Sequence, residues 1–453
     1  MALNAWIRGS GWASKGVLAA GILAVLLQSA PLRAQGIPLI RDDEIETLVA
    51  DYARPLLKAA GLAQGNIQMK LVNNKSFNAF VLDGRNVYIH IGTLMQAETP
   101  NQVIGVIAHE IGHIDGAHVA AMRSRMQREQ TRMLLLRLLG IGAAIFSGSG
   151  EAVVAADEII VRGFLAERRQ QESAADQAGL RFLNATRQSG RGMLETFERL
   201  GQQNRGFSEA NPYLLSHPIE RVRIAQLRDA VTASPYYATK DPPELQLRHD
   251  LMRAKLFGFT TPPQDVYRTY PASDTSLAAR YARAIARNCS GNCAQAVPDI
   301  DGLIKEQPSN PFFWELKGHV YAREGKHAQA VPPLRKALQL LGGRSTLIKM
   351  ELAKSLVEMN DPGQLDEAIR ILEPALEASG GEDASGYMVL ARAYAAKQRI
   401  SEADLAMARA HLIRGDHDQA VIFAKRAQAR LAPGSRAWLK ADDIIKIKPQ
   451  TQN

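Results

Sequence analysis

The strongest constraint on the fold is a five-residue segment that occurs twice. Ala294–Pro298 and Ala328–Pro332 both read Ala-Gln-Ala-Val-Pro and lie 34 residues apart, and Asp418–Val421 is a weaker copy. A fixed offset of this length indicates repeated helix–turn–helix units, each too small to bury its apolar face alone. Stacking of neighbouring units buries a continuous core and leaves a concave face suited to holding a segment of another protein.

The residues around the second copy fit the tetratricopeptide pattern, which has this period. The pattern positions are Trp314, Gly318, Tyr321, Ala330, Leu334 and Ala337. Two further units fit around Ala368–Ala375 and Ala391–Ala403. A plain helical bundle does not explain the offset. We therefore predict an all-α solenoid over residues 272–453, preceded by a proline-rich connector at 234–271.

A second segment constrains the chemistry. His109–His113 reads His-Glu-Ile-Gly-His inside an apolar stretch. Thr99, Pro100 and Gln102 predict the N-cap, first residue and capping-box partner of a helix that runs to about His118. Because this helix is apolar almost all round, we expect it to be buried, and its ionisable groups then need a compensating partner.

Metal binding is such a partner. His109 and His113 stand four residues apart, so both imidazoles lie on one helix face. Zinc binds neutral imidazole nitrogens tetrahedrally, and a catalytic site has three protein ligands and one open position. Glu110 lies beside the pair, where its carboxylate can take a proton from a water molecule that the metal activates. An exposed polar helix face is the alternative interpretation.

Two schemes supply the third ligand. In one, a glycine turn delivers a histidine six residues after the second histidine. Gly116 is in place, but His118 comes one residue early. In the other, a later helix provides Glu172, with Asp176 on the same face to orient a ligand histidine. We favour the second scheme, and its alternative is an ordinary polar helix with both acidic residues in solvent.

The segment before the histidine pair predicts a helix and a small antiparallel sheet. Asp42–Leu62 has helical periodicity, whereas Ile67–Val72 and Phe77–Leu82 read as strands. Asp83–Asn86 reads as a hairpin turn into a strand at Val87–Ile91. The edge of such a sheet either pairs with an extended peptide substrate or only completes the core.

The N-terminus has the pattern of a secretory signal peptide. Arg8 and Lys15 precede an apolar run from Val17 to Leu27, and small residues then allow cleavage after Ala34. The run is too short to span a bilayer. We therefore expect residues 1–34 to be removed, a catalytic domain at 35–233, and a mature protein that is exported to the periplasm.

Composition adds two smaller expectations. The net charge is +9, but the sequence has none of the aromatic-interleaved basic clusters of nucleic-acid binders. The positive charge is a weak indication of peripheral contact with an anionic membrane surface. Cys289 and Cys293 are the only two cysteines. In an oxidising compartment we expect them to form a short disulfide, since no redox or four-cysteine metal motif is present.

Taken together, these motifs carry a family resemblance. His109–His113 followed by Glu172–Asp176, with Asn78–Phe80 upstream and Ser216–Pro218 downstream, resembles the gluzincin metallopeptidases of the CAAX prenyl protease and HtpX group. The resemblance implies one Zn²⁺ per chain, held by His109, His113 and Glu172. It also implies that Glu110 is the general base, that Asp176 supports a ligand, and that Asn78, Ala79 and Phe80 form the substrate edge strand.

The same resemblance implies roles further along the chain. His217 is expected to occupy the open metal position and to hold the enzyme latent, although from sequence alone it is a loop histidine. Arg221 or Arg223 is expected near the substrate or transition-state oxygen, and both remain candidates.

We expect an α+β, mostly α protein: a zincin-like catalytic domain followed by a tetratricopeptide solenoid. The predicted function is a periplasmic zinc endopeptidase, with chaperone activity as an additional expectation. The resemblance implies that it degrades unfolded or misassembled outer-membrane proteins and contacts their assembly machinery through the repeats. A non-proteolytic chaperone with a latent metal site is one alternative, and a zinc hydrolase of small molecules is another that the solenoid disfavours.

Overall fold

The computed structural model describes residues 37–125, 127–128, 151–203, 212–289, 291, 293–378 and 383–447. The predicted signal peptide and the side chains of Cys289 and Cys293 lie outside this part. The N-terminal elements are β1 (Leu39–Ile40), α2 (Asp43–Ala59), β2 (Gln68–Val72), β3 (Ala79–Val81), β4 (Asn86–His90), α3 (Ile91–Gln96), α4 (Pro100–Asp115), α6 (Glu151–Ala185), α7 (Arg191–Gln203), α8 (Pro212–Ser216) and α9 (Arg221–Thr232). Within these ranges, no helix has both the length and the apolar character needed to cross a membrane.

The predicted small sheet is present, but it is mixed rather than antiparallel. Its strand order is β1-β2-β4-β3. The expected hairpin joins β3 to β4, and Asp83 accepts hydrogen bonds from the backbone N–H groups of Arg85 and Asn86 at 2.9 Å. β2 instead pairs with β4 in parallel, because the segment after β2 crosses to the far side of β4. This order leaves β3 as an edge strand.

Helices α2 and α4 contribute to the core of this region together with the strands, α3, α6 and α7. Asp42 caps α2, and Ile45, Leu48 and Tyr52 lie on its buried stripe. α4 starts at Pro100 as predicted, yet the capping box is absent: Gln102 accepts from the N–H of Glu98 at 2.9 Å. α4 also ends at Asp115, three residues earlier than predicted, and Ala117 then adopts a left-handed conformation with φ of 50°.

A pair of helices fills the segment predicted to connect the domains, namely α10 (Pro243–Thr260) and α11 (Pro263–Thr269). Met252 and Leu256 of α10 pack into the core formed by α2 and α4. Leu251 and Ala254, on another face of α10, belong to the core of the first repeat. α10 is therefore a shared element of both domains.

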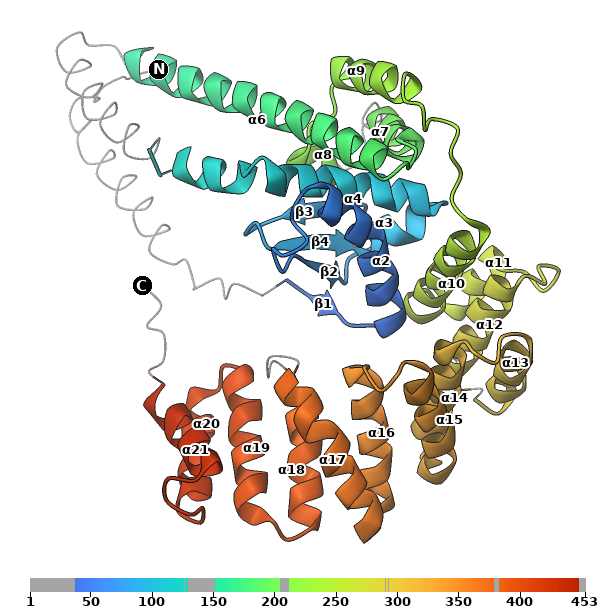
Figure 1. The fold of residues 1–453 in the computed structure, drawn as a ribbon, viewed down its shortest axis with the longest axis vertical. Helices are drawn as coiled ribbons and strands as arrows, with labels where there is room; N and C mark the ends of the chain where they lie inside the picture. Colours follow the sequence, from blue (N-terminus) through green and yellow to red (C-terminus); the bar gives the residue numbers. More distant parts are fainter. Residues whose placement is uncertain are drawn as a thin grey trace, which may run out of the picture. The chain divides into compact units, whose positions relative to one another are not determined.

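The C-terminal half consists of helix pairs that follow one another along the chain (Figure 1). Their bounds are α12 (Leu277–Cys289), α13 (Cys293–Glu306), α14 (Pro311–Arg323), α15 (His327–Leu340), α16 (Thr346–Met359), α17 (Pro362–Ala378), α18 (Ala384–Ala396), α19 (Ile400–Ile413), α20 (His417–Gln428) and α21 (Arg436–Lys446). The repeated small residues are buried between the helices: Ala330 and Ala420 are 0% exposed. The predicted fold class, a catalytic α+β domain followed by an all-α solenoid, is confirmed.

Candidate metal centre

Helix α4 brings the two predicted histidines together. The Nε2 atoms of His109 and His113 lie 3.1 Å apart, and the two side chains are buried. Their separation of four residues gives this result directly, because it stacks the side chains one turn apart. The two Nε2 atoms therefore face a common point.

Helix α6 supplies the carboxylates. Glu172 Oε2 is 3.4 Å from His109 Nε2, and its Oε1 is 3.5 Å from His113 Nε2. Asp176 Oδ1 is 2.8 Å from His109 Nδ1, on the opposite side of that ring. Gly112 permits this approach, since a Cβ at this position would lie 2.6 Å from the carbonyl oxygen of Ala175. The glycine between the histidines thus determines how closely α6 packs on α4.

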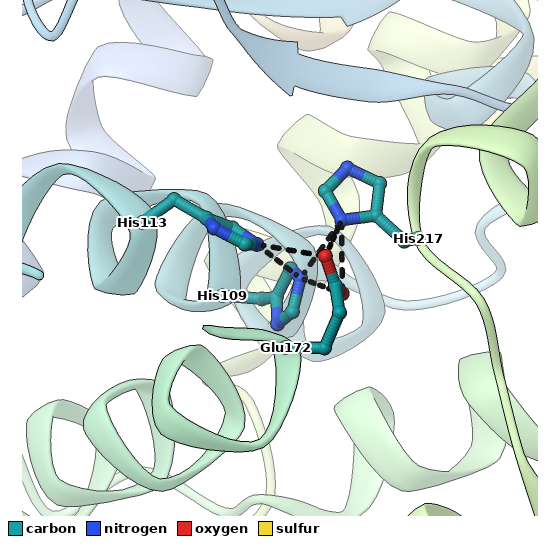
Figure 2. A group of neighbouring side chains, drawn as sticks. All are labelled: His109, His113, Glu172 and His217. Atoms are coloured by element: carbon teal, nitrogen blue, oxygen red, sulfur yellow. Dashed lines mark hydrogen bonds and ion pairs between the residues drawn. The ribbon is translucent and has the colours of Figure 1, made fainter. Parts of the chain in front are cut away.

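His217 completes the cluster from the loop after α8. Its Nδ1 is 3.2 Å from His109 Nε2 and 3.1 Å from Glu172 Oε2 (Figure 2). Tyr213 stacks on the His217 ring with centroids 4.6 Å apart. His217 Nε2 is turned toward Glu110, 3.5 Å from Oε1. Sequence analysis missed Tyr213, because nothing in its local pattern distinguishes it from a core aromatic residue.

The arginine at the centre is Arg223. It donates to both oxygens of Asp176, and its Nη1 is 2.9 Å from Glu172 Oε2 and 3.0 Å from the carbonyl oxygen of Pro218. Arg221 is exposed and is not among the residues gathered at the centre. The Arg223 guanidinium is thus engaged by the two carboxylates and by the His217 loop.

The donor atoms fit a tetrahedral ion. One ligand atom from each of His109, His113, Glu172 and His217 can be chosen so that all lie within 4.8 Å of one another. A tetrahedron with zinc–nitrogen bonds has edges of about 3.4 Å, close to the separations of 3.1 to 3.5 Å given above. Both oxygens of Glu110 and Nε2 of His217 are buried without a hydrogen-bond partner among the described residues. Such atoms require a ligand or water.

The electrostatics also favour a cation. Burial lowers the pKa of His109, but the hydrogen bonds that its ring donates to Asp176 and Glu172 outweigh burial and raise that pKa to about 9. Burial together with the nearby His109 holds the pKa of His113 well below its usual range. Burial raises the pKa of Glu110 above its usual value, which makes its carboxylate a stronger base. The carboxylates thus stabilise positive charge at the point where the imidazoles meet.

The remaining predicted residues lie as follows. Asn78 precedes the edge strand β3, which contains Ala79 and Phe80, and the Asn78 Oδ1 is 3.4 Å from the Ser216 hydroxyl, beside His217. His118 is not among the converging donors; its Nδ1 contacts His113 Nδ1 at 2.9 Å. The geometry therefore favours Glu172 over His118 as the third ligand.

A helix with two histidines four residues apart and a glutamate beside the first, facing a carboxylate from a second helix, is an arrangement typical of metallopeptidases. Comparison with known proteins agrees. Residues 40–231 match peptidase family M48, and residues 281–344 match a tetratricopeptide repeat. The chain therefore combines a segment similar to M48 peptidases with a later segment similar to tetratricopeptide repeats.

Several curated proteins are similar to this chain. The beta-barrel assembly-enhancing protease of Escherichia coli (strain K12) is 24% identical over 430 residues, which cover 92% of this chain and 85% of that protein. The protein of the same name from Yersinia pestis is 24% identical over 421 residues, 90% of this chain and 84% of that protein. Metalloprotease LoiP of Escherichia coli (strain K12) is 26% identical over 189 residues, 41% of this chain and 72% of that protein.

Proposed function

We propose that the chain is a periplasmic zinc endopeptidase that degrades unfolded or misassembled outer-membrane proteins, and that its repeats bring it to the machinery that assembles them. The convergence of His109, His113 and Glu172 beside the buried carboxylate of Glu110, which accepts no hydrogen bond in the described structure, carries the catalytic part of the proposal. The names of the relatives, the repeats and the N-terminal signal pattern support the location and the clients.

In this proposal His109, His113 and Glu172 hold one zinc ion per chain. When bound, the ion supplies Lewis acidity, which polarises a carbonyl group and lowers the pKa of water. Glu110 takes the proton from the attacking water and passes it to the leaving amine. Asp176 keeps the proton of His109 on Nδ1, so that Nε2 is free to bind the metal.

The edge strand β3 is the proposed substrate-binding element. Its outer edge has no strand partner in the described part of the chain. An extended peptide that adds to this edge receives main-chain hydrogen bonds whatever its sequence. This mode suits a protease that acts on unfolded chains.

His217 is the proposed latency residue. In this proposal its Nδ1, which lies 3.2 Å from His109 Nε2 and 3.1 Å from Glu172 Oε2, is the fourth metal ligand, so water and substrate gain access only after the loop moves. Arg168 and Arg223 donate to the carbonyl oxygens of Ser216 and Pro218, on either side of His217. These bonds hold the loop in the closed position.

Casein cleavage tests the catalytic assignment. Glu110→Gln is expected to lower the cleavage rate by about 10²- to 10⁴-fold, because it removes the general base and keeps the shape of the side chain. One zinc per chain, measured by atomic absorption, should remain. Cleavage at the wild-type rate by this variant would rule out the mechanism. If the wild type bound zinc and prevented aggregation without cleaving any client, the chaperone alternative would replace it.

A further inference from the structure

His118 contacts the outer side of a predicted metal ligand. Its Nδ1 is 2.9 Å from Nδ1 of His113, and the two rings meet edge to face with centroids 5.0 Å apart. The other nitrogen of His113, Nε2, faces the centre at 3.1 Å from His109 Nε2. His113 is thus held between the centre and His118.

The direction of this hydrogen bond follows from the chemistry of imidazole. A neutral imidazole carries one N–H, and a nitrogen that binds a metal must be the other one. If His113 binds through Nε2, its proton is on Nδ1, so His113 donates and His118 Nδ1 accepts. We propose that His118 is a positioning residue that fixes the tautomer and ring orientation of His113; this inference rests on the proposed zinc site.

The local backbone places His118 there. Ala117 has a φ of 50°, a left-handed conformation that costs a non-glycine residue about 1 kcal/mol or more. This turn brings the His118 ring back over Gly116, where a Cβ would overlap the ring. Gly116 itself has an ordinary φ of −75°, so its lack of a side chain serves the ring and not its own backbone.

The two ligand histidines thus have different supports. His109 donates to Asp176, an ionised carboxylate that also pairs with Arg223. His113 donates to an imidazole. Outer partners of this kind typically change metal affinity by about 10- to 100-fold when they are removed. We expect the same range for His118.

Zinc affinity of the metal-free mature protein, measured by competition with a chromophoric chelator, tests the role. His118→Leu removes the acceptor and is expected to weaken zinc binding by about 10- to 100-fold. His118→Asn places an amide oxygen near the position of Nδ1 and should restore affinity to within about threefold of wild type. Gly116→Ala retains His118 but displaces its ring, so it should resemble His118→Leu. His411→Leu, a histidine change in α19 of the repeats, is the matched control and should have no effect.

The outcomes separate this inference from the function on which it rests. Absence of zinc binding by wild type, or full binding by His113→Ala, would refute the zinc site itself. With that site intact, wild-type affinity in His118→Leu, or equal weakness of His118→Asn and His118→Leu, would overturn the role of His118. Should His118→Leu fail to fold, as judged by its thermal melt, Gly116→Ala decides the question, and wild-type affinity in that variant would overturn the inference.

Discussion

The metal centre and a second cluster of buried charged groups differ in whether their buried polar atoms have partners. The second cluster, here termed the junction cluster, consists of Lys255 with Asp42, Glu44, Glu315 and Tyr281. It lies where α10 meets α2 and the first repeats. Lys255 Nζ is 2.8 Å from Asp42, 3.2 Å from Glu44 and 3.5 Å from Glu315, and the Tyr281 hydroxyl donates to Glu44 at 3.0 Å.

Each ionised group of the junction cluster has an oppositely charged neighbour. In the metal centre, by contrast, Glu110 and His217 retain buried atoms without a hydrogen bond in the described structure. Burial of charge alone therefore does not mark a functional site, because structural ion pairs also bury charge. Polar atoms that remain unpartnered are the more specific sign.

The largest expected effect tests the metal centre. Glu172→Gln removes the charged ligand while retaining its shape, and we expect loss of bound zinc and a fall in casein cleavage of about 10³-fold. In this variant Arg223 still donates hydrogen bonds to both oxygens of Asp176, so the thermal midpoint of the metal-free protein should change little. A variant that retained zinc and activity would show that Glu172 is not a required zinc ligand.

A substitution in the junction cluster should instead lower stability and leave zinc binding unchanged. Lys255→Met leaves its carboxylates without their cation and is expected to lower the free energy of unfolding by about 3 kcal/mol, measured by urea denaturation. Zinc affinity should stay at the wild-type value. Lys317→Met, which breaks the exposed pair with Asp301, is the control and should cost less than about 1 kcal/mol. A loss of zinc affinity in Lys255→Met would contradict the separation of the two clusters.

The two clusters also differ in how far sequence predicts them. The spacing within His109–His113 and between Glu172 and Asp176 places side chains on shared helix faces, so local periodicity is enough to nominate them. The junction cluster joins residues from α2 and its N-cap, α10, α12 and α14, which no local pattern relates. Arg221 and Arg223 could not be separated in advance, because the choice depends on how α9 is rotated against α6.

The sheet also shows that sequence predicts local features but not pairing between distant segments. Alternating residues predicted three of its strands and the Asp83–Asn86 turn, since both signals are local. The parallel pairing of β2 with β4 was not predicted, because it depends on where the chain goes after β2. Likewise, the sequence presented His118 only as a candidate ligand, while its contact with the outer nitrogen of His113 depends on the left-handed turn at Ala117.

The buried side chain of His249 is a neutral group, unlike the charged groups of the two clusters, and both of its ring nitrogens are hydrogen-bonded. Its Nδ1 accepts from the Tyr52 hydroxyl at 3.0 Å, and its Nε2 donates to the carbonyl oxygen of Ala97 at 2.9 Å. Burial lowers its pKa to about 4. A lowered pKa means that the folded state prefers the neutral ring, so this stability is complete above about pH 6.5 and is lost as the pH falls toward 4.

We therefore expect the opening free energy of α2 to fall by about 1 to 2 kcal/mol between pH 7 and pH 5 on account of this residue. Hydrogen exchange of the α2 amides measures it. His249→Gln, whose amide can still donate to Ala97, should show a smaller fall over the same range. An identical pH dependence in the two proteins would mean that the neutral ring does not contribute.

The smallest effect is expected at the one member of the metal centre that comes from a loop. His217→Ala opens the fourth position while His109, His113 and Glu172 remain, so casein cleavage should rise by about 3- to 10-fold if loop opening limits the rate. Tyr213, which stacks on the ring, should then become more accessible to iodination. Because His217 also faces Glu110, a fall in the rate would instead indicate that its imidazole assists the reaction, and latency would have to be abandoned. Zinc affinity distinguishes these two roles of His217. If His217 is a latency ligand, its removal should weaken zinc binding. If it acts only on the substrate, its removal should leave zinc binding unchanged.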